Sequence, residues 1–178
     1  MTDVQLAASS LVALSPRALH ALRDRASAQA LQEAGYAAGE GTFRAFSAWL
    51  PRAAGVDHPS ELAAPRLAEI LSQFFVSLGW GAVQVTPVGD AAVAVDASAW
   101  AEATPEAQLQ YPSCFFTAGL LADFMCRLAE ASLAVMEVEC RSKGDARCRW
   151  LVGAPATLSS LYEHMTQGAD YLTVLGAA

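Results

Sequence analysis

Residues 135–150 read VMEVECRSKGDARCRW, and much of the fold follows from the hairpin that this segment predicts. Its middle, Lys143-Gly144-Asp145, has the composition of a three-residue turn in which glycine supplies the positive φ. A turn centred on Gly144 places Cys140 directly opposite Cys148, with their Cβ atoms roughly 5 Å apart. Two thiolates at that separation suit metal–sulfur bonds of about 2.3 Å in a tetrahedron. The segment therefore predicts two strands that present a pair of candidate metal ligands.

A third candidate ligand, Cys114, stands at the start of a predicted helix that runs from Ser113 to Glu130. The positive end of the helix dipole favours a thiolate there. The first residues do not resemble a signal peptide and a cytosolic chain is expected, so metal binding or free thiols are expected in preference to disulfides. The fourth cysteine, Cys126, lies well inside the helix and is expected to be a core thiol.

The fourth ligand would be a carboxylate, and the sequence leaves two choices. Strict strand alternation places both Glu137 and Glu139 on the face opposite Cys140. A bulge near Val138-Glu139 would bring one of them round, but geometry alone does not decide which. Two other interpretations of the cysteines stay open at this point. They could be inert buried thiols, or Cys140 and Cys148 could form a cross-strand disulfide.

The remaining segments alternate between helical and extended patterns. Residues 1–14 resemble a loosely held arm, and residues 15–178 are expected to form a single domain. Helices are predicted from Ser15-Pro16 to about Leu31, over Phe43–Trp49 as far as Pro51, over Ser60–Leu78 and over Thr157–Gln167. The glycine-rich segment 35–41 separates the first two, and its small residues allow close helix packing.

Extended patterns cover Trp80–Pro87 and Ala91–Ala97, in addition to Leu133–Arg141 and Ala146–Val152 in the second hairpin. The order of a helix followed by a hairpin thus occurs twice. We predict an α+β fold, with a twisted antiparallel sheet of about four strands flanked by helices.

The composition excludes some classes of function. The net charge is −7, whereas nucleic acids and anionic membranes require a basic face. No window of 18 apolar residues predicts a membrane span, so a cytoplasmic location is expected. Apolar residues make up 54% of the chain. This surplus favours either a dimer interface or a lined internal pocket.

The motif resembles the 4-vinyl reductase domain family in Cys114, Ala118-Gly119-Leu120, Glu137-x-x-Cys140, Gly144-Asp145 and Cys148. In the related phenol-sensing domains of bacterial activators, the residues matching Cys114, Glu137, Cys140 and Cys148 bind zinc. The resemblance therefore implies a Zn²⁺ site here, and it favours Glu137 over Glu139. It also implies a fold similar to TRAPP-type tethering subunits and haem nitric-oxide-binding domains, with an apolar pocket and a homodimeric state.

The resemblance leads us to expect a stand-alone zinc-containing binding module for a small hydrophobic ligand, aromatic or tetrapyrrole-like, that acts as a sensor or carrier. The His and Trp that hold the phenol hydroxyl in those sensors have no counterpart here, which favours an apolar or larger ligand. Four protein ligands would make the zinc structural. The candidate pocket residues are aromatic or aliphatic: Phe74, Phe75, Trp80, Tyr111, Phe115, Phe116 and Leu120.

Two other functions are considered. One is a reductase, or an accessory protein, in the reduction of a vinyl group in (bacterio)chlorophyll synthesis. That chemistry needs a hydride donor, and the sequence carries no dinucleotide-binding fingerprint. The other is a dimeric interaction scaffold without a ligand. No catalytic residue is predicted.

Overall fold

The structure is a computed structural model that describes residues 11, 12 and 14–176. The predicted arm at 1–14 lies mostly outside the described residues. The elements are α1 (Pro16–Arg23), α2 (Ala28–Ala54), η2 (Pro59–Glu61), α3 (Ala64–Ser77), β1 (Gln84–Val88), β2 (Ala92–Ala97), η3 (Pro105–Ala107), α4 (Phe115–Ala129), β3 (Ala134–Glu139), η4 (Arg141–Lys143), β4 (Cys148–Gly153), α5 (Pro155–Thr166) and α6 (Tyr171–Val174).

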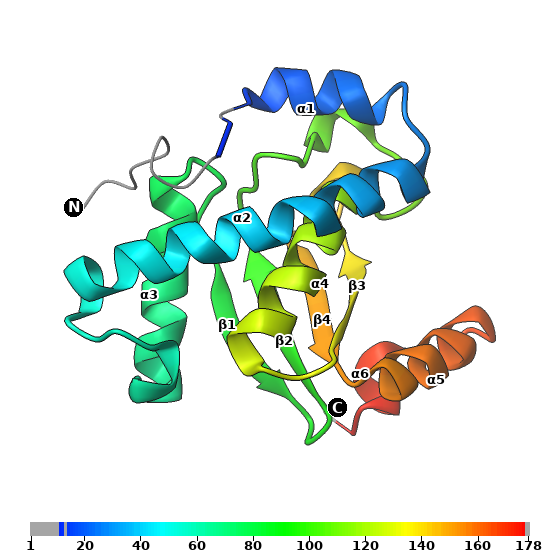
Figure 1. Cartoon of the computed structure of the whole chain (residues 1–178). Helices are drawn as coiled ribbons and strands as arrows, with labels where there is room; N and C mark the ends of the chain where they lie inside the picture. The colour runs from blue at the N-terminus through cyan, green and yellow to red at the C-terminus, as the bar shows by residue number, and fades with distance from the viewer. Residues whose placement is uncertain (1–10, 13, 177–178) are drawn as a thin grey trace.

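The four strands form one antiparallel sheet in the order β1-β2-β4-β3 (Figure 1). Each hairpin contributes an outer and an inner strand, and the inner strands β2 and β4 pair along the middle of the sheet. The predicted α+β class and the four-stranded antiparallel sheet flanked by helices are confirmed.

The two faces of the sheet are covered by different helices. One face packs against α2, α3 and α4 around a core rich in aromatic side chains, which includes Phe46, Phe74, Phe124 and Trp150. The other face packs against α5 and α6 through a smaller cluster that contains Leu151 and Leu161 (Figure 1). A side chain on β3 or β4 therefore contacts either α2, α3 and α4 or α5 and α6, depending on the face of the sheet to which it points.

Helices α2 and α4 are in close contact because each has glycine where the other helix approaches. A Cβ atom on Gly35 would lie 2.0 Å from the backbone oxygen of Phe116, and one on Gly119 would lie 1.9 Å from that of Gln32. Since real Cβ contacts are never this short, neither position can carry a side chain at this helix separation. This agrees with the close packing expected of the glycine-rich segment.

Three local predictions were wrong. The first predicted helix is interrupted after Arg23, because the Ser27 side chain accepts a hydrogen bond from Ala30 N–H and begins a new helix. The second error is the predicted break over the glycine-rich segment and the predicted end at Pro51. Helix α2 instead runs for 27 residues through both, and Gly55 caps it in the left-handed conformation.

The third error concerns the second hairpin. Its turn is longer than three residues and contains the 3₁₀ turn η4. Lys143 and Asp145 both donate their N–H groups to the backbone oxygen of Cys140.

None of the helices formed by the described residues combines the length and apolarity that a bilayer crossing requires.

Candidate functional site

A bulge in β3 determines which side chains face α4. The pairing of β3 with β4 shifts between Glu137, opposite Trp150, and Glu139, opposite Arg149. If the pairing of Glu139 with Arg149 is continued by one residue, Cys140 lies opposite Cys148, as the sequence predicts. The shift turns Val138 and Glu139 toward α5 and α6, and it leaves Glu137 and Cys140 on the α4 side.

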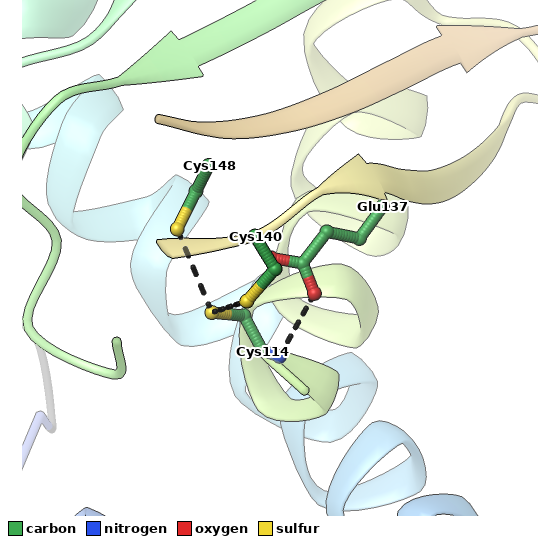
Figure 2. A group of neighbouring side chains, drawn as sticks. All are labelled: Cys114, Glu137, Cys140 and Cys148. Atoms are coloured by element: carbon green, nitrogen blue, oxygen red, sulfur yellow. Dashed lines mark hydrogen bonds between the residues drawn. The ribbon is translucent and has the colours of Figure 1, made fainter. Parts of the chain in front are cut away.

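Three cysteine sulfurs meet beneath the start of α4 (Figure 2). The Sγ atom of Cys114 lies 3.8 Å from that of Cys140 and 3.9 Å from that of Cys148. All three residues are fully buried, and all four cysteines of the chain are free thiols. Because a disulfide requires a sulfur–sulfur distance of about 2.05 Å, these sulfurs are too far apart for one.

Glu137 completes the group, which we call the Cys₃Glu cluster. One ligand atom from each of Cys114, Glu137, Cys140 and Cys148 lies within 4.8 Å of the others. Oε2 of Glu137 accepts a hydrogen bond from the Cys114 N–H at 2.9 Å (Figure 2). Oε1 is buried and accepts no hydrogen bond from the described residues. A buried carboxylate oxygen without a partner is costly.

Burial and mutual contact shift the pKa values of the groups in the cluster. Contact with Cys140 and burial raise the pKa of Cys114. Burial, together with the charge on Cys140, raises the pKa of Glu137 to about 9. Hydrogen bonds from Cys114 and Cys148 lower the pKa of Cys140. Burial with these neighbours therefore keeps protons on a carboxyl and a thiol that a bound cation would release.

The donor set and its spacing fit a tetrahedral zinc ion. Since Zn–S bonds are about 2.3 Å long, two sulfurs of one zinc tetrahedron lie about 3.8 Å apart. The sulfurs of Cys140 and Cys148 lie at this separation from that of Cys114. Cys148 Sγ also accepts the N–H of Arg141 at 3.5 Å, which orients it within the hairpin. The unpartnered oxygen of Glu137 supplies a fourth donor.

Glu102 is a functional candidate that the sequence analysis missed. Its side chain is 1% exposed. The carboxylate accepts the N–H of Phe116 at 3.0 Å, the N–H of Thr117 at 2.8 Å and the Thr117 hydroxyl at 2.5 Å. Burial raises the pKa of Glu102, and these hydrogen bonds oppose the rise. Glu102 therefore holds the first turn of α4, one residue after Cys114. No local pattern reveals this, because Glu102 comes from an irregular segment.

Glu139, the alternative ligand, belongs to a separate ionic network on the other face. It accepts a hydrogen bond from the Tyr171 hydroxyl and pairs with Arg147 at 2.9 Å. Tyr171 also accepts from Arg149, whose guanidinium makes two hydrogen bonds to Asp96 at 2.7 and 2.6 Å. This network attaches α6 to the sheet and leaves no role for Glu139 in the Cys₃Glu cluster.

An apolar cavity of about 150 Å³ lies between the N-terminal segment and the helices. We call it the N-terminal cavity. It is lined by Leu11, Val12, Leu14, Ser15, Pro16, Leu19, Ala38, Thr42, Leu78, Gly79, Trp80, Ala101, Phe116 and Leu120.

The seven candidate pocket residues fall in different places. Trp80, Phe116 and Leu120 line the N-terminal cavity. Phe74 and Phe75 are fully buried in the aromatic core, and Tyr111 is 74% exposed. Phe115 is half-buried in the first turn of α4. The sequence analysis missed the lining residues from the N-terminal segment, because apolar residues before a helix carry no periodic signal.

The fold and the site together define a small α+β module with an apolar cavity beside the N-terminal segment and a cluster of metal-ligand type. Residues 93–154 match the V4R domain, which confirms the resemblance drawn from the motif. The matched segment runs from β2 to β4 and contains all four residues of the Cys₃Glu cluster. No curated protein matches the chain.

Three solved structures are similar to this chain at low identity. The phenol-responsive sensory domain of the transcription activator PoxR, solved with phenol, is 18% identical, with a TM-score of 0.56 over 81% of this chain and 76% of that one. A trafficking protein particle complex subunit 3 from Naegleria fowleri, covalently bound to palmitic acid, is 16% identical, with a TM-score of 0.52 over 75% and 85%. A vinyl-4-reductase family protein from Methanocaldococcus jannaschii is 17% identical, with a TM-score of 0.49 over 75% and 72%.

Proposed function

We propose that this protein is a zinc-containing binding module for a small hydrophobic molecule and acts as a sensor or carrier. The proposal is carried by one structural relationship. Cys114 of the Cys₃Glu cluster stands two residues before Phe116, which lines the N-terminal cavity. The same turn of α4 therefore belongs to both sites.

The zinc ion would be structural, since four protein ligands leave no open coordination position. Its ligands would come from two elements of the fold. Cys140 and Cys148 would bind it from the second hairpin, and Cys114 would bind it from the start of α4. Glu102 accepts the backbone N–H groups of Phe116 and Thr117 in that helix. Together these contacts fix the wall of the cavity, so a ligand would meet a surface that is already organised.

The comparisons support ligand binding as the role of the module. The PoxR sensory domain is described with phenol, and the trafficking subunit is described with palmitic acid. Both are single small molecules that are mainly apolar. The apolar surplus of the composition, 54% of the residues, supports the expectation of a homodimer.

Native mass spectrometry of the purified protein tests the proposal. We expect one zinc ion per chain, and a bound small molecule that organic extraction removes. A fully folded protein without metal would refute the zinc site. If no compound is recovered from cells, and none is bound from a panel of hydrophobic molecules, the protein is better described as a scaffold without a ligand. The masses of the intact assembly give the oligomeric state in the same experiment.

A further inference from the structure

We infer that the ligand is an uncharged molecule about the size of one six-membered ring, and that it binds in the N-terminal cavity. This inference rests on the proposed function, and it adds the position of the site and the chemical class of the ligand.

The volume of the cavity limits the size of the ligand. At about 150 Å³ it equals an engineered apolar cavity that binds benzene. Pockets for larger ligands usually exceed about 300 Å³. A tetrapyrrole contains four linked rings and does not fit. Of the two ligand classes expected from the sequence, the aromatic one is therefore favoured.

The lining excludes a charged ligand. None of the described residues that line the cavity is ionisable as an acid or a base near neutral pH. An ionised carboxylate or amine would lose its water of hydration and find no opposite charge in the wall. The ligand therefore enters in a neutral form.

Among the polar side chains that line the cavity, Thr42 is the one whose hydroxyl hydrogen is already used. The hydroxyl of Thr42, a lining residue on α2, donates its hydrogen to the backbone oxygen of Ala38 at 2.9 Å. The oxygen of this hydroxyl can still accept a hydrogen bond from a ligand. Thr42 therefore favours a ring that carries one hydrogen-bond donor, such as a hydroxyl, over a ring that carries only an acceptor.

The wall also contains a spectroscopic reporter. The rings of Trp80 and Phe116 are stacked, with centroids 6.0 Å apart. Trp80 lines the cavity, whereas Trp100 and Trp150 lie in the aromatic core. A ring bound in the cavity would contact the Trp80 indole and change its fluorescence.

The aromatic core is the other place where a ring could bind. One observation favours it: the indole Nε1 of Trp150 is buried and has no hydrogen-bond acceptor among the described residues. However, Phe74, Phe75 and Phe124 are fully buried, and their ring centroids lie 5.5 to 6.3 Å apart. Side chains at these separations fill the space between α3, α4 and the sheet.

Calorimetric titration of the zinc-loaded protein with toluene, phenol and benzoate tests the inference. We expect toluene and phenol to bind and benzoate, which is ionised at neutral pH, to bind at least tenfold more weakly. Ala38→Leu places extra carbon atoms in the cavity and should weaken both neutral probes at least tenfold. Ala37→Leu is the matched control, because Ala37 is exposed on the same helix and does not line the cavity.

Two further variants make the result specific to this site. Thr42→Val should weaken phenol about fivefold and leave toluene unchanged, since only phenol has a donor for the hydroxyl. Trp80→Phe should remove the fluorescence change that toluene causes, and Trp150→Phe should retain it. The opposite fluorescence result would place the ligand in the aromatic core and overturn the inference.

The outcomes separate this inference from the proposed function. A compound recovered from cells that binds the wild type and Ala38→Leu equally well would overturn the inference and leave the proposed function standing. The same holds for a charged or multi-ring compound that binds more tightly than the neutral probes. If no recovered or added compound binds, both the inference and the proposed ligand-binding function are rejected. A melting curve shows whether Ala38→Leu is folded, and Thr42→Val provides an independent answer if it is not.

Discussion

Glu137 and Glu139 stand two positions apart in β3, yet their carboxylates lie on opposite faces of the sheet. Glu137 accepts the N–H of Cys114 beneath α4, whereas Glu139 accepts the hydroxyl of Tyr171 beside α6. In a regular strand, residues two apart share a face. The register shift at Val138 separates them, so each carboxylate serves a different layer of helices.

This separation predicts opposite results for two similar substitutions. Glu137→Gln should lower zinc affinity by at least about tenfold, because a neutral amide is a poorer ligand than a carboxylate. Glu139→Gln should leave zinc binding unchanged and cost about 1–3 kcal/mol of unfolding free energy through its contacts with Tyr171 and Arg147. Competition with a chromogenic chelator measures the first effect, and urea unfolding measures the second. Equal zinc affinities in the two variants would contradict the assignment of Glu137.

Two cysteine-to-serine substitutions, one inside the Cys₃Glu cluster and one outside it, form a second matched pair. Cys140→Ser should abolish stoichiometric zinc and lower stability by about 3 kcal/mol or more, since the binding free energy of a structural metal is also folding free energy. For a chain of this length, that corresponds to a fall in Tm of roughly 6–12 °C.

Cys126→Ser is the control for Cys140→Ser. The Cys126 sulfur lies outside the Cys₃Glu cluster and bonds only with the backbone of Leu133, and a serine hydroxyl can make similar bonds. Zinc content by elemental analysis should stay at one per chain in Cys126→Ser. A wild-type melting temperature for Cys140→Ser would show that the metal has no structural role.

The helix contact predicts that two glycines respond in opposite ways to alanine. At Gly119 the new Cβ would meet the backbone oxygen of Gln32 at 1.9 Å, so α2 and α4 must separate, at a cost of about 3 kcal/mol or more. At Gly41, also in α2, the nearest atom would be a side-chain carbon of Leu11 at 3.5 Å. Gly41→Ala should therefore stabilise the protein by about 0.5–1 kcal/mol. Chemical denaturation of both variants checks the contrast, and a neutral Gly119→Ala would contradict it.

Zinc affinity should fall as the pH falls, because the ligands must lose protons to bind the ion. In the metal-free fold, contact with Cys140 and burial raise the pKa of Cys114, and burial raises the pKa of Glu137 to about 9. At both groups, protons therefore compete with the metal.

Competition with a chromogenic chelator at several pH values measures this dependence, and Glu137→Gln should flatten it because one of the protons is no longer present. A zinc affinity that does not change with pH would contradict the prediction.

The sequence predicted the second hairpin and the cluster better than it predicted the helices. The register that places Cys140 opposite Cys148 follows from residue counting around Gly144, and the bulge near Val138 follows from the need to bring a glutamate round. Both are local arguments about strand geometry. The choice of Glu137 over Glu139 was not local, because it depends on contacts with α4 and α6.

The error over segment 35–41 has a tertiary cause, whereas the break after Arg23 has a local one in the Ser27 cap. Glycine lowers helix propensity, so the segment 35–41 looked like a break between helices. In the structure these residues are helical, because Gly35 gains the contact with α4 that a side chain would prevent. The cavity was missed in part for a similar reason. Its walls come from segments far apart in the chain, and no periodic pattern marks a residue such as Leu11.

The V4R match and the cavity walls divide the chain unevenly. Of the residues that line the N-terminal cavity, only Ala101, Phe116 and Leu120 fall within the matched segment 93–154, and all the others precede Gly81. The residues of the Cys₃Glu cluster all lie in the second half of the sequence, whereas most residues that line the cavity lie in the first half. Substitutions in the first half can therefore change the cavity wall and leave the candidate metal ligands unaltered.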